Sequence, residues 1–278
     1  MSASAPKPIP SSEAVWRTYD EAEARLAAPL SERMVALAGL RPGMKVLDLA
    51  TGRGEPAILA ARRVAPTGSV TGIDVAAPML EMARERATRE GVGNIDLRVA
   101  NAESFDEIPV PPFDATLARW GLMYMANPIA ALAAARRAMV PHGVLVAALW
   151  AEPERVSYYS LPRHSLEKYA APVPIDFSAP GIFHYADVGR IERDFTAAGF
   201  AIETIEEMDV DVMEAATGEA LVAWVRAFGM TRLLNELSAE IQAAWERDFI
   251  AAAEPLRRDG FVRLGGVTRI VVGRAVGV

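Results

Sequence analysis

Short aliphatic segments alternate with amphipathic segments along the first 150 residues of the chain. Apolar positions recur at helical spacing from Trp16 to Leu40, and an aliphatic run typical of a buried strand follows at 44–50. The same rhythm predicts further strands at 69–75, 95–100, 113–119 and 144–150, and helices that start at Glu55 or span 78–90 and 129–139. Alternating strands and helices of this kind form a parallel sheet that is covered on both faces. The sequence therefore predicts an α/β fold.

The pattern changes after Trp150. The stretch 151–186 is rich in proline and aromatic residues and lacks the earlier alternation. Strand-like alternation returns at 201–212, and an aliphatic run at 267–276 predicts the last strand. Between these two strands, the apolar stripes of 217–259 indicate two amphipathic helices.

These changes of pattern divide the chain into a core with two insertions. Residues 1–12, which are rich in Pro, Ser and Ala, are expected to be a mobile lead-in. Residues 13–150 are expected to form the larger part of the core, together with N-terminal helices. We expect 151–186 to be the first insertion, and 187–278 to complete the core around a helical insertion at 217–259.

Composition and charge exclude several classes of protein. The chain has 278 residues and a formal net charge of −7, and no basic block stands out, so nucleic acid is not an expected partner. It has no cysteine, which excludes disulfides, thiolate catalysis and cysteine-ligated metals. It has no apolar run of about 18 residues and no hydrophobic signal core, so we expect a cytoplasmic protein without membrane contact. No carboxylates or histidines cluster at metal-ligand spacing, so no metal site is expected.

The stretch 46–57, VLDLATGRGEPA, carries the clearest chemical signal. A predicted strand leads into Gly52-x-Gly54 and then into a helix. Glycine lets a ligand approach the backbone, and the start of a helix offers free N–H groups. Two glycines alone are as typical of a tight turn between a strand and a helix as they are of a ligand site. However, Asp74 closes the second strand 20 residues after Gly54, where an acidic side chain reaches a ribose diol in nucleotide-binding α/β folds.

Two kinds of nucleotide ligand fit this turn. The glycine spacing also satisfies the relaxed dinucleotide pattern, and an acidic residue at this position suits an NAD ribose. A pyrophosphate would lie at the helix start, where Glu55 supplies like charge and Pro56 lacks an N–H donor. S-adenosylmethionine has no phosphate, and its cationic sulfonium and ammonium groups are compatible with Asp48 and Glu55. Charge therefore favours S-adenosylmethionine over NAD.

The glycine turn, Asp74 and the polar end of the third strand at Asn101 resemble the class I S-adenosylmethionine-dependent methyltransferases. The closest branch is similar to the bacterial ubiquinone/menaquinone C-methyltransferases. The resemblance runs from about Leu30 to Trp150 and returns at the last strand. It implies a Rossmann-like, seven-stranded, mostly parallel sheet with an antiparallel last strand, helices on both faces and helical lid insertions. It also implies S-adenosylmethionine as the methyl donor and S-adenosylhomocysteine as its product.

The resemblance further implies roles for individual residues. The glycine turn would cradle the methionine part of the donor, Asp74 would bind the ribose hydroxyls, and the residues that follow the second and third strands would contact adenine. The expected cofactor-binding residues are Ala50, Gly52, Gly54, Asp74, Val75, Met79, Asn101, Ala102, Arg119 and Trp120. The family usually has Asp where this chain has Asn101, which still accepts a hydrogen bond but without charge assistance.

The acceptor is less clearly indicated than the donor. Proximity, alignment and exclusion of water can account for most of the rate enhancement in methyl transfer. An oxygen or carbon nucleophile nevertheless benefits from a general base. His184 and the neighbouring Tyr185 lie where the first insertion meets the core, and they are the candidate catalytic residues, although a packing role is the commoner one for such residues. The aromatic residues of the two insertions predict a small, fairly apolar acceptor, aromatic or quinone-like.

Three functions from different classes are consistent with these observations. The first is a methyltransferase with a small-molecule acceptor, acting as a monomer or homodimer. The others are an NAD-dependent oxidoreductase and a nucleotide-fold protein that binds a ligand without turnover. Thermal stabilisation by S-adenosylhomocysteine and not by NAD would separate the first from the second.

Overall fold

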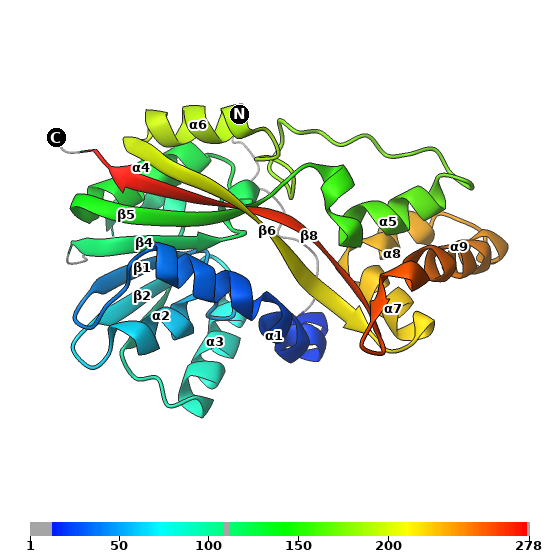
Figure 1. The fold of residues 1–278 in the computed structure, drawn as a ribbon, viewed down its shortest axis with the longest axis horizontal. Helices are drawn as coiled ribbons and strands as arrows, with labels where there is room; N and C mark the ends of the chain where they lie inside the picture. Colours follow the sequence, from blue (N-terminus) through cyan, green and yellow to red (C-terminus); the bar gives the residue numbers. More distant parts are fainter. Residues whose placement is uncertain (1–12, 108–111, 277–278) are drawn as a thin grey trace.

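The computed structural model of the chain describes residues 13–107 and 112–276 (Figure 1). The expected mobile lead-in at 1–12 lies outside the described residues. One mixed sheet has the strand order β3-β2-β1-β4-β5-β8-β6, and the short β7 pairs with β8. The strands are β1 (Lys45–Leu49), β2 (Ser69–Asp74), β3 (Ile95–Val99), β4 (Phe113–Arg119), β5 (Met139–Trp150), β6 (Phe200–Ala215), β7 (Arg257–Arg258) and β8 (Phe261–Ala275).

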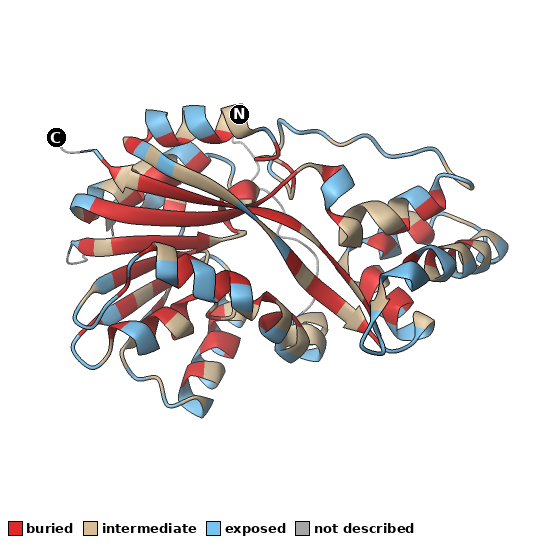
Figure 2. Ribbon diagram, viewed as in Figure 1, coloured by how far each residue is buried: buried red, intermediate tan, exposed pale blue. Residues whose placement is uncertain are grey.

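The first five strands are parallel, and an α-helix connects β1 to β2, β2 to β3 and β4 to β5. Aliphatic side chains make β1, β4 and β5 the centre of the core, and most of these strands are coloured as buried in Figure 2. The helices around the sheet are α1 (Glu13–Leu37), α2 (Ala57–Val64), α3 (Ala77–Arg89), α4 (Pro128–Arg137) and α6 (Val188–Ala197). Helices α4 and α6 pack against each other, whereas α1 contacts α2 and the long strand β6.

β6 and β8 form a long antiparallel hairpin that extends from the core sheet into a helical lobe (Figure 1). The lobe consists of α5 (Ser157–Leu166), α7 (Gly218–Val225), α8 (Thr231–Leu234) and α9 (Ala239–Ala253). The buried indole of Trp245 in α9 donates a hydrogen bond of 2.8 Å to the carbonyl of Pro162 in α5. Tyr19 of α1 stacks on Trp224 of α7 with ring centroids 4.5 Å apart. Both insertions therefore contribute to one lobe, which also packs on the N-terminal helix.

The structure confirms the predicted fold class, since β8 runs antiparallel to both β5 and β6. It differs from the sequence prediction in three details. The two residues of β7 add a short eighth strand. Pro56 does not lie in the first turn of its helix, because α2 begins at Ala57 and Pro56 is the N-cap. The region 217–259 has an irregular turn at 226–230 between α7 and α8, because Phe228 and Gly229 leave the helical region of φ and ψ.

Within the described residues, no helix is both long enough and apolar enough to cross a membrane.

Candidate functional site

The glycine turn after β1 is built from left-handed backbone. Ala50 has φ of 53°, Gly52 of 53° and Gly54 of 89°. This conformation costs an alanine about 1 kcal/mol, and it persists only where the surroundings enforce it. At Gly121, just beyond β4, a Cβ would lie 2.5 Å from the Cβ of Ala50. The ends of β1 and β4 therefore meet so closely that only glycine fits opposite Ala50.

The two glycines of the turn serve different purposes. A Cβ at Gly52 would meet only the carbonyl oxygen of Ala50, at 4.0 Å, so this backbone is open to a ligand. A Cβ at Gly54 would lie 2.8 Å from Cδ1 of Ile58 and 3.3 Å from Cβ of Ala83. Gly54 is therefore required for packing of the turn against α2 and α3, whereas Gly52 provides the open approach.

The carboxylate of Asp74 ties the glycine turn to the end of β2. Its Oδ2 accepts a hydrogen bond of 2.8 Å from the amide of Gly52, and its Oδ1 accepts one of 2.8 Å from the amide of Ala76. Burial raises the pKa of Asp74, and these backbone hydrogen bonds oppose that rise. Val75 comes next and leaves 66% of its surface exposed, an apolar side chain facing solvent beside the turn. Met79, in the first turn of α3, is half-buried.

The end of β3 supplies a polar loop next to this turn. Asn101 is exposed, and its side-chain oxygen accepts a hydrogen bond of 3.0 Å from the amide of Glu103. Ala102 between them is buried. The carboxylate of Glu103 accepts in turn from the amide of Asn127, the residue that caps α4. The carboxyl ends of β1, β2 and β3 thus place an open glycine, an acid and an amide at one edge of the sheet, as predicted from their positions in sequence.

Asp48 is the most unusual ionisable group in the described part of the chain. It lies in β1 with 0% exposure, and neither carboxylate oxygen has a hydrogen-bond partner there. Burial raises the pKa of Asp48 to about 7. Nearby Thr51 and the positive charge of Arg119 oppose this rise only in part. The sequence showed an acid within an aliphatic run, but it could not show that this acid forms no ion pair with any described residue.

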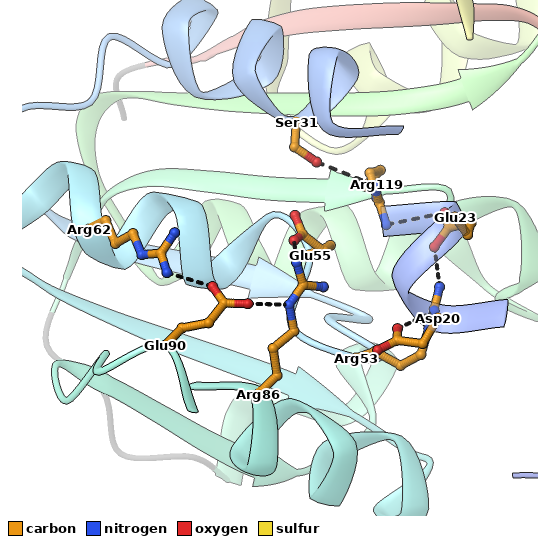
Figure 3. A network of polar contacts seen from close by, with 9 residues as sticks. All are labelled: Asp20, Glu23, Ser31, Arg53, Glu55, Arg62, Arg86, Glu90 and Arg119. Atoms are coloured by element: carbon orange, nitrogen blue, oxygen red, sulfur yellow. Dashed lines mark hydrogen bonds and ion pairs between the residues drawn. The ribbon is translucent and has the colours of Figure 1, made fainter. Parts of the chain in front are cut away.

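A charged network from α1 covers the other side of the turn (Figure 3). Arg53 of the turn forms ion pairs with Asp20 and Glu23. Glu23 also lies 3.5 Å from Arg119 at the end of β4, which donates a 3.3 Å hydrogen bond to Ser31. Burial would raise the pKa of Glu23, but the guanidinium groups of Arg119 and Arg53 lower it below its ordinary value. Arg119 therefore anchors α1 onto the sheet in this structure.

A second group of charges lies behind the turn. Glu55 pairs with Arg86 of α3 at 2.5 Å, and Arg86 also pairs with Glu90 at 2.8 Å (Figure 3). These residues border a cavity of about 410 Å³ between α1, α2 and α3. Gly52 and Asp74 are not among its lining residues, so this cavity is separate from the open side of the turn.

Trp120 continues the site from the end of β4 toward the helical lobe. Its backbone is left-handed, with φ of 55°, and its indole donates a 3.2 Å hydrogen bond to Thr268. Its ring stacks on Trp150 at the end of β5, with centroids 4.6 Å apart. Trp150 in turn meets the ring of Tyr158 in α5 edge-on at 5.2 Å. A continuous aromatic wall therefore connects the strand ends with the first insertion.

The contacts of His184 and Tyr185 lie on the α6 side of the fold. Nδ1 of His184 is 3.1 Å from the carbonyl oxygen of Ala179, and burial, together with the charge of Arg190, lowers the pKa of His184. Tyr185 is fully buried, and its hydroxyl donates a 3.0 Å hydrogen bond to Asp194. Burial raises the pKa of Tyr185. No described contact brings either residue to the glycine turn or to Trp120, so their role as a base stays a prediction.

Comparisons with known proteins agree with this geometry. Residues 40–169 match the family described as methyltransferase domain. The chain is 28% identical to nocamycin O-methyltransferase of Saccharothrix syringae over 84% of this chain and 88% of that protein. It is 40% identical to a ubiquinone/menaquinone biosynthesis C-methyltransferase of Shewanella pealeana over 42% of this chain, but it spans only 47% of that relative. A SAM-dependent methyltransferase structure from Aquifex aeolicus matches with a TM-score of 0.51 and 20% identity, over 69% of this chain and 89% of that one. The expected resemblance is confirmed.

Proposed function

We propose that this chain, an enzyme of the methyltransferase class whose residues 40–169 form a methyltransferase domain, transfers a methyl group from S-adenosylmethionine to a small, largely apolar acceptor. The observation that carries this proposal is the buried carboxylate of Asp48, which forms no ion pair with the described residues and is influenced by Asp74, the acid that holds the open backbone of Gly52. A buried charge is costly unless an opposite charge accompanies it. The ammonium group of S-adenosylmethionine is such a charge, and a pyrophosphate is not.

The residues around the turn fit the rest of this cofactor. Asp74 uses one lone pair of each oxygen to hold the turn, and the remaining lone pairs can accept from the two ribose hydroxyls. The exposed side chain of Val75 offers an apolar surface for the adenine ring. Asn101 and Ala102 would meet the edge of that ring. In this proposal Ala50 and Met79 complete the cradle, while Arg119 acts by holding α1 over it.

Bound S-adenosylmethionine supplies a methyl group that is activated by a sulfonium. The chain's own contribution is to hold the acceptor in line with that methyl group and to exclude water, which can account for most of the barrier reduction. The stacked rings of Trp120 and Trp150 provide an apolar wall for this purpose. His184 has a lowered pKa and is neutral near pH 7, so it is proposed as the base if the acceptor loses a proton.

This wall and the names of the relatives support a proposal about the acceptor. One similar protein is named for nocamycin and another for ubiquinone and menaquinone biosynthesis. We propose an acceptor of the same kind, a small molecule with an aromatic or quinone-like ring. The aromatic wall formed by Trp120, Trp150 and Tyr158 suits the face of such a ring.

Calorimetry on the full chain tests the cofactor assignment. S-adenosylhomocysteine should bind and NAD should not. An Asp74→Ala change should weaken S-adenosylhomocysteine binding by about 1–3 kcal/mol, because charge-assisted hydrogen bonds are lost. Asp96→Ala is the matched control, since Asp96 is exposed on the neighbouring strand β3 and, among the described residues, pairs with the exposed side chain of Arg98. Binding of NAD, or equal affinity in both variants, would contradict the proposal.

A further inference from the structure

Arg163 in α5 is a partly buried arginine without a carboxylate partner. Its guanidinium lies 3.6 Å from the ring centroid of Tyr159, and its Nη1 donates a 3.1 Å hydrogen bond to the carbonyl of Tyr159. No Asp or Glu in the described residues forms an ion pair with it. The buried arginines Arg53, Arg119 and Arg269 differ, because each pairs with at least one acidic side chain. Among the described residues, the positive charge of Arg163 therefore has no carboxylate that compensates it.

Such an arrangement is unfavourable in the free protein. A guanidinium stays charged at any accessible pH, and burying it without a counter-ion costs free energy. Burial lowers the pKa of Arg163, in the direction expected for an uncompensated cation. The cation–π contact with Tyr159 recovers only part of this cost. An anion that reaches Arg163 would remove the penalty.

The surroundings of Arg163 suit an oxygen anion on a flat ring. Tyr158 precedes the stacked Tyr159 in α5, and Tyr124 ends the 3₁₀ turn Leu122–Tyr124 that follows β4. Burial raises the pKa of Tyr124 to about 12 and that of Tyr158 well above its ordinary value, so both hydroxyls keep their protons and can donate. Tyr124, Arg163 and Glu23 all influence the ionisation of Tyr158, and the charge of Glu23 is already paired with Arg53 and Arg119. Arg163 is therefore the one of these charges that pairs with no acid among the described residues, and it acts on a region that holds two phenol donors.

The irregular turn at 226–230 approaches Arg163 with a residue that has no side chain. Gly229 has φ of 143°, a conformation that favours glycine, and a Cβ there would lie 3.9 Å from Nη2 of Arg163. No side chain of that residue therefore covers the guanidinium. On the other side, the ring of Tyr158 meets Trp150, which stacks on Trp120. The guanidinium and the aromatic wall belong to one region between the strand ends and the lobe.

We infer that Arg163 binds an acidic oxygen of the acceptor, a carboxylate or an ionised enol or phenol, while the ring of the acceptor packs on the wall of Trp120, Trp150 and Tyr158. Tyr124 and Tyr158 donate hydrogen bonds to the same anion. This inference rests on the proposed function, because it assigns the substrate class of that site. It makes Arg163 a determinant of specificity for anionic acceptors, with no part in binding the methyl donor.

Binding of a matched pair of probes to the full chain tests this inference. The probes are 1-hydroxy-2-naphthoate and its methyl ester, measured by calorimetry with and without saturating S-adenosylhomocysteine. The acid should bind the unaltered protein at least about tenfold more tightly than the ester, as a charge-assisted pair predicts. Arg163→Met should abolish this preference. Arg232→Met is the control, because Arg232 is exposed in α8 of the same lobe.

Two further measurements separate a binding role from a structural one. The melting temperature of the Arg163→Met protein without ligand should equal or exceed that of the unaltered protein, because an uncompensated charge is removed. Its affinity for S-adenosylhomocysteine should stay within about threefold of the original, since the change is remote from the glycine turn. A lower melting temperature would overturn the inference and assign Arg163 to packing.

Equal binding of acid and ester, or binding of neither probe at about 1 mM, would also overturn the inference. Failure of the proposed function has a different result. In that case S-adenosylhomocysteine would not bind the unaltered protein, whereas the preference for the acid and its dependence on Arg163 would persist.

Discussion

Replacement of Asp48 by asparagine should change both the stability of the protein and its pH dependence. The folded chain keeps a proton on Asp48 up to about pH 7, whereas the ordinary pKa of the side chain is 3.8. Between these values the folded state binds more protons than the unfolded state, so stability falls as pH rises. The free energy of unfolding keeps falling until the pH passes the pKa of Asp48 in the folded protein, and above that pH it no longer changes through this group.

The size of the effect follows from the shift of about three pKa units. At 1.36 kcal/mol for each unit, the charged form of buried Asp48 costs the folded protein about 4 kcal/mol at pH 8. Asparagine has nearly the same shape and is neutral at every pH. The Asp48→Asn protein should therefore be more stable than the original by about 2–4 kcal/mol at pH 8, the lower figure allowing for amide N–H groups without acceptors. At pH 4 the two proteins should differ little.

Urea denaturation followed by circular dichroism at pH 4, 6, 7 and 8 would measure this difference, with Asp96→Asn as the exposed control. The same variant should bind S-adenosylhomocysteine more weakly by about 1–3 kcal/mol, because the ammonium group loses its counter-ion. In the unaltered protein, affinity should rise with pH up to about pH 7, as Asp48 ionises. The reasoning would be refuted if the asparagine variant kept the original pH dependence of stability and the original affinity.

Two substitutions and one hydrogen-exchange measurement give further tests. Gly54→Val should destabilise the fold by about 2–4 kcal/mol in urea denaturation, because of its positive φ and the contact with Ile58, and unchanged stability would contradict the packing role. His184→Ala should lower turnover by roughly 10²-fold while cofactor affinity in calorimetry stays the same, and full activity would leave orientation as the mechanism. Hydrogen exchange should slow in 151–186 and 217–259 when S-adenosylhomocysteine and an acceptor analogue bind together, whereas protection confined to 46–103 would contradict a lid.

The sequence predicted the half of the fold whose signals are local. The strand, glycine turn and helix at 46–57 could be recognised because periodicity and glycine report backbone conformation directly. Asp74 could be placed at the same edge because parallel strands bring their carboxyl ends together. The irregular turn at 226–230 was missed, because the apolar stripe on either side of it continues and only Gly229 departs strongly from helical backbone.

The features of the site that could not be predicted from the sequence depend on contacts between residues that are far apart along the chain. The hydroxyl of Tyr185 donates a hydrogen bond to Asp194 in α6. Tyr185 is therefore a poorer candidate for a base than its position in the sequence indicated. Asp48 and Arg163 are notable because neither forms an ion pair with the described part of the chain, and such a lack is visible only when the neighbours are in place. Sequence patterns report which residues are buried, but not which buried charges are left uncompensated.

The position of β8 in the sheet also sets the order in which the protein can be completed on the ribosome. β5 and β6 have no hydrogen-bonded contact with each other, because β8 lies between them. Until Phe261–Ala275 has left the exit tunnel, both strands present unpaired edges and the lobe lacks the long hairpin that joins it to the core. The nascent chain must therefore hold two exposed edges apart from the time that β6 (Phe200–Ala215) emerges until β8 follows. Release of the last strand closes both edges in one step, so premature termination within β8 should yield an aggregating chain rather than a partly active one.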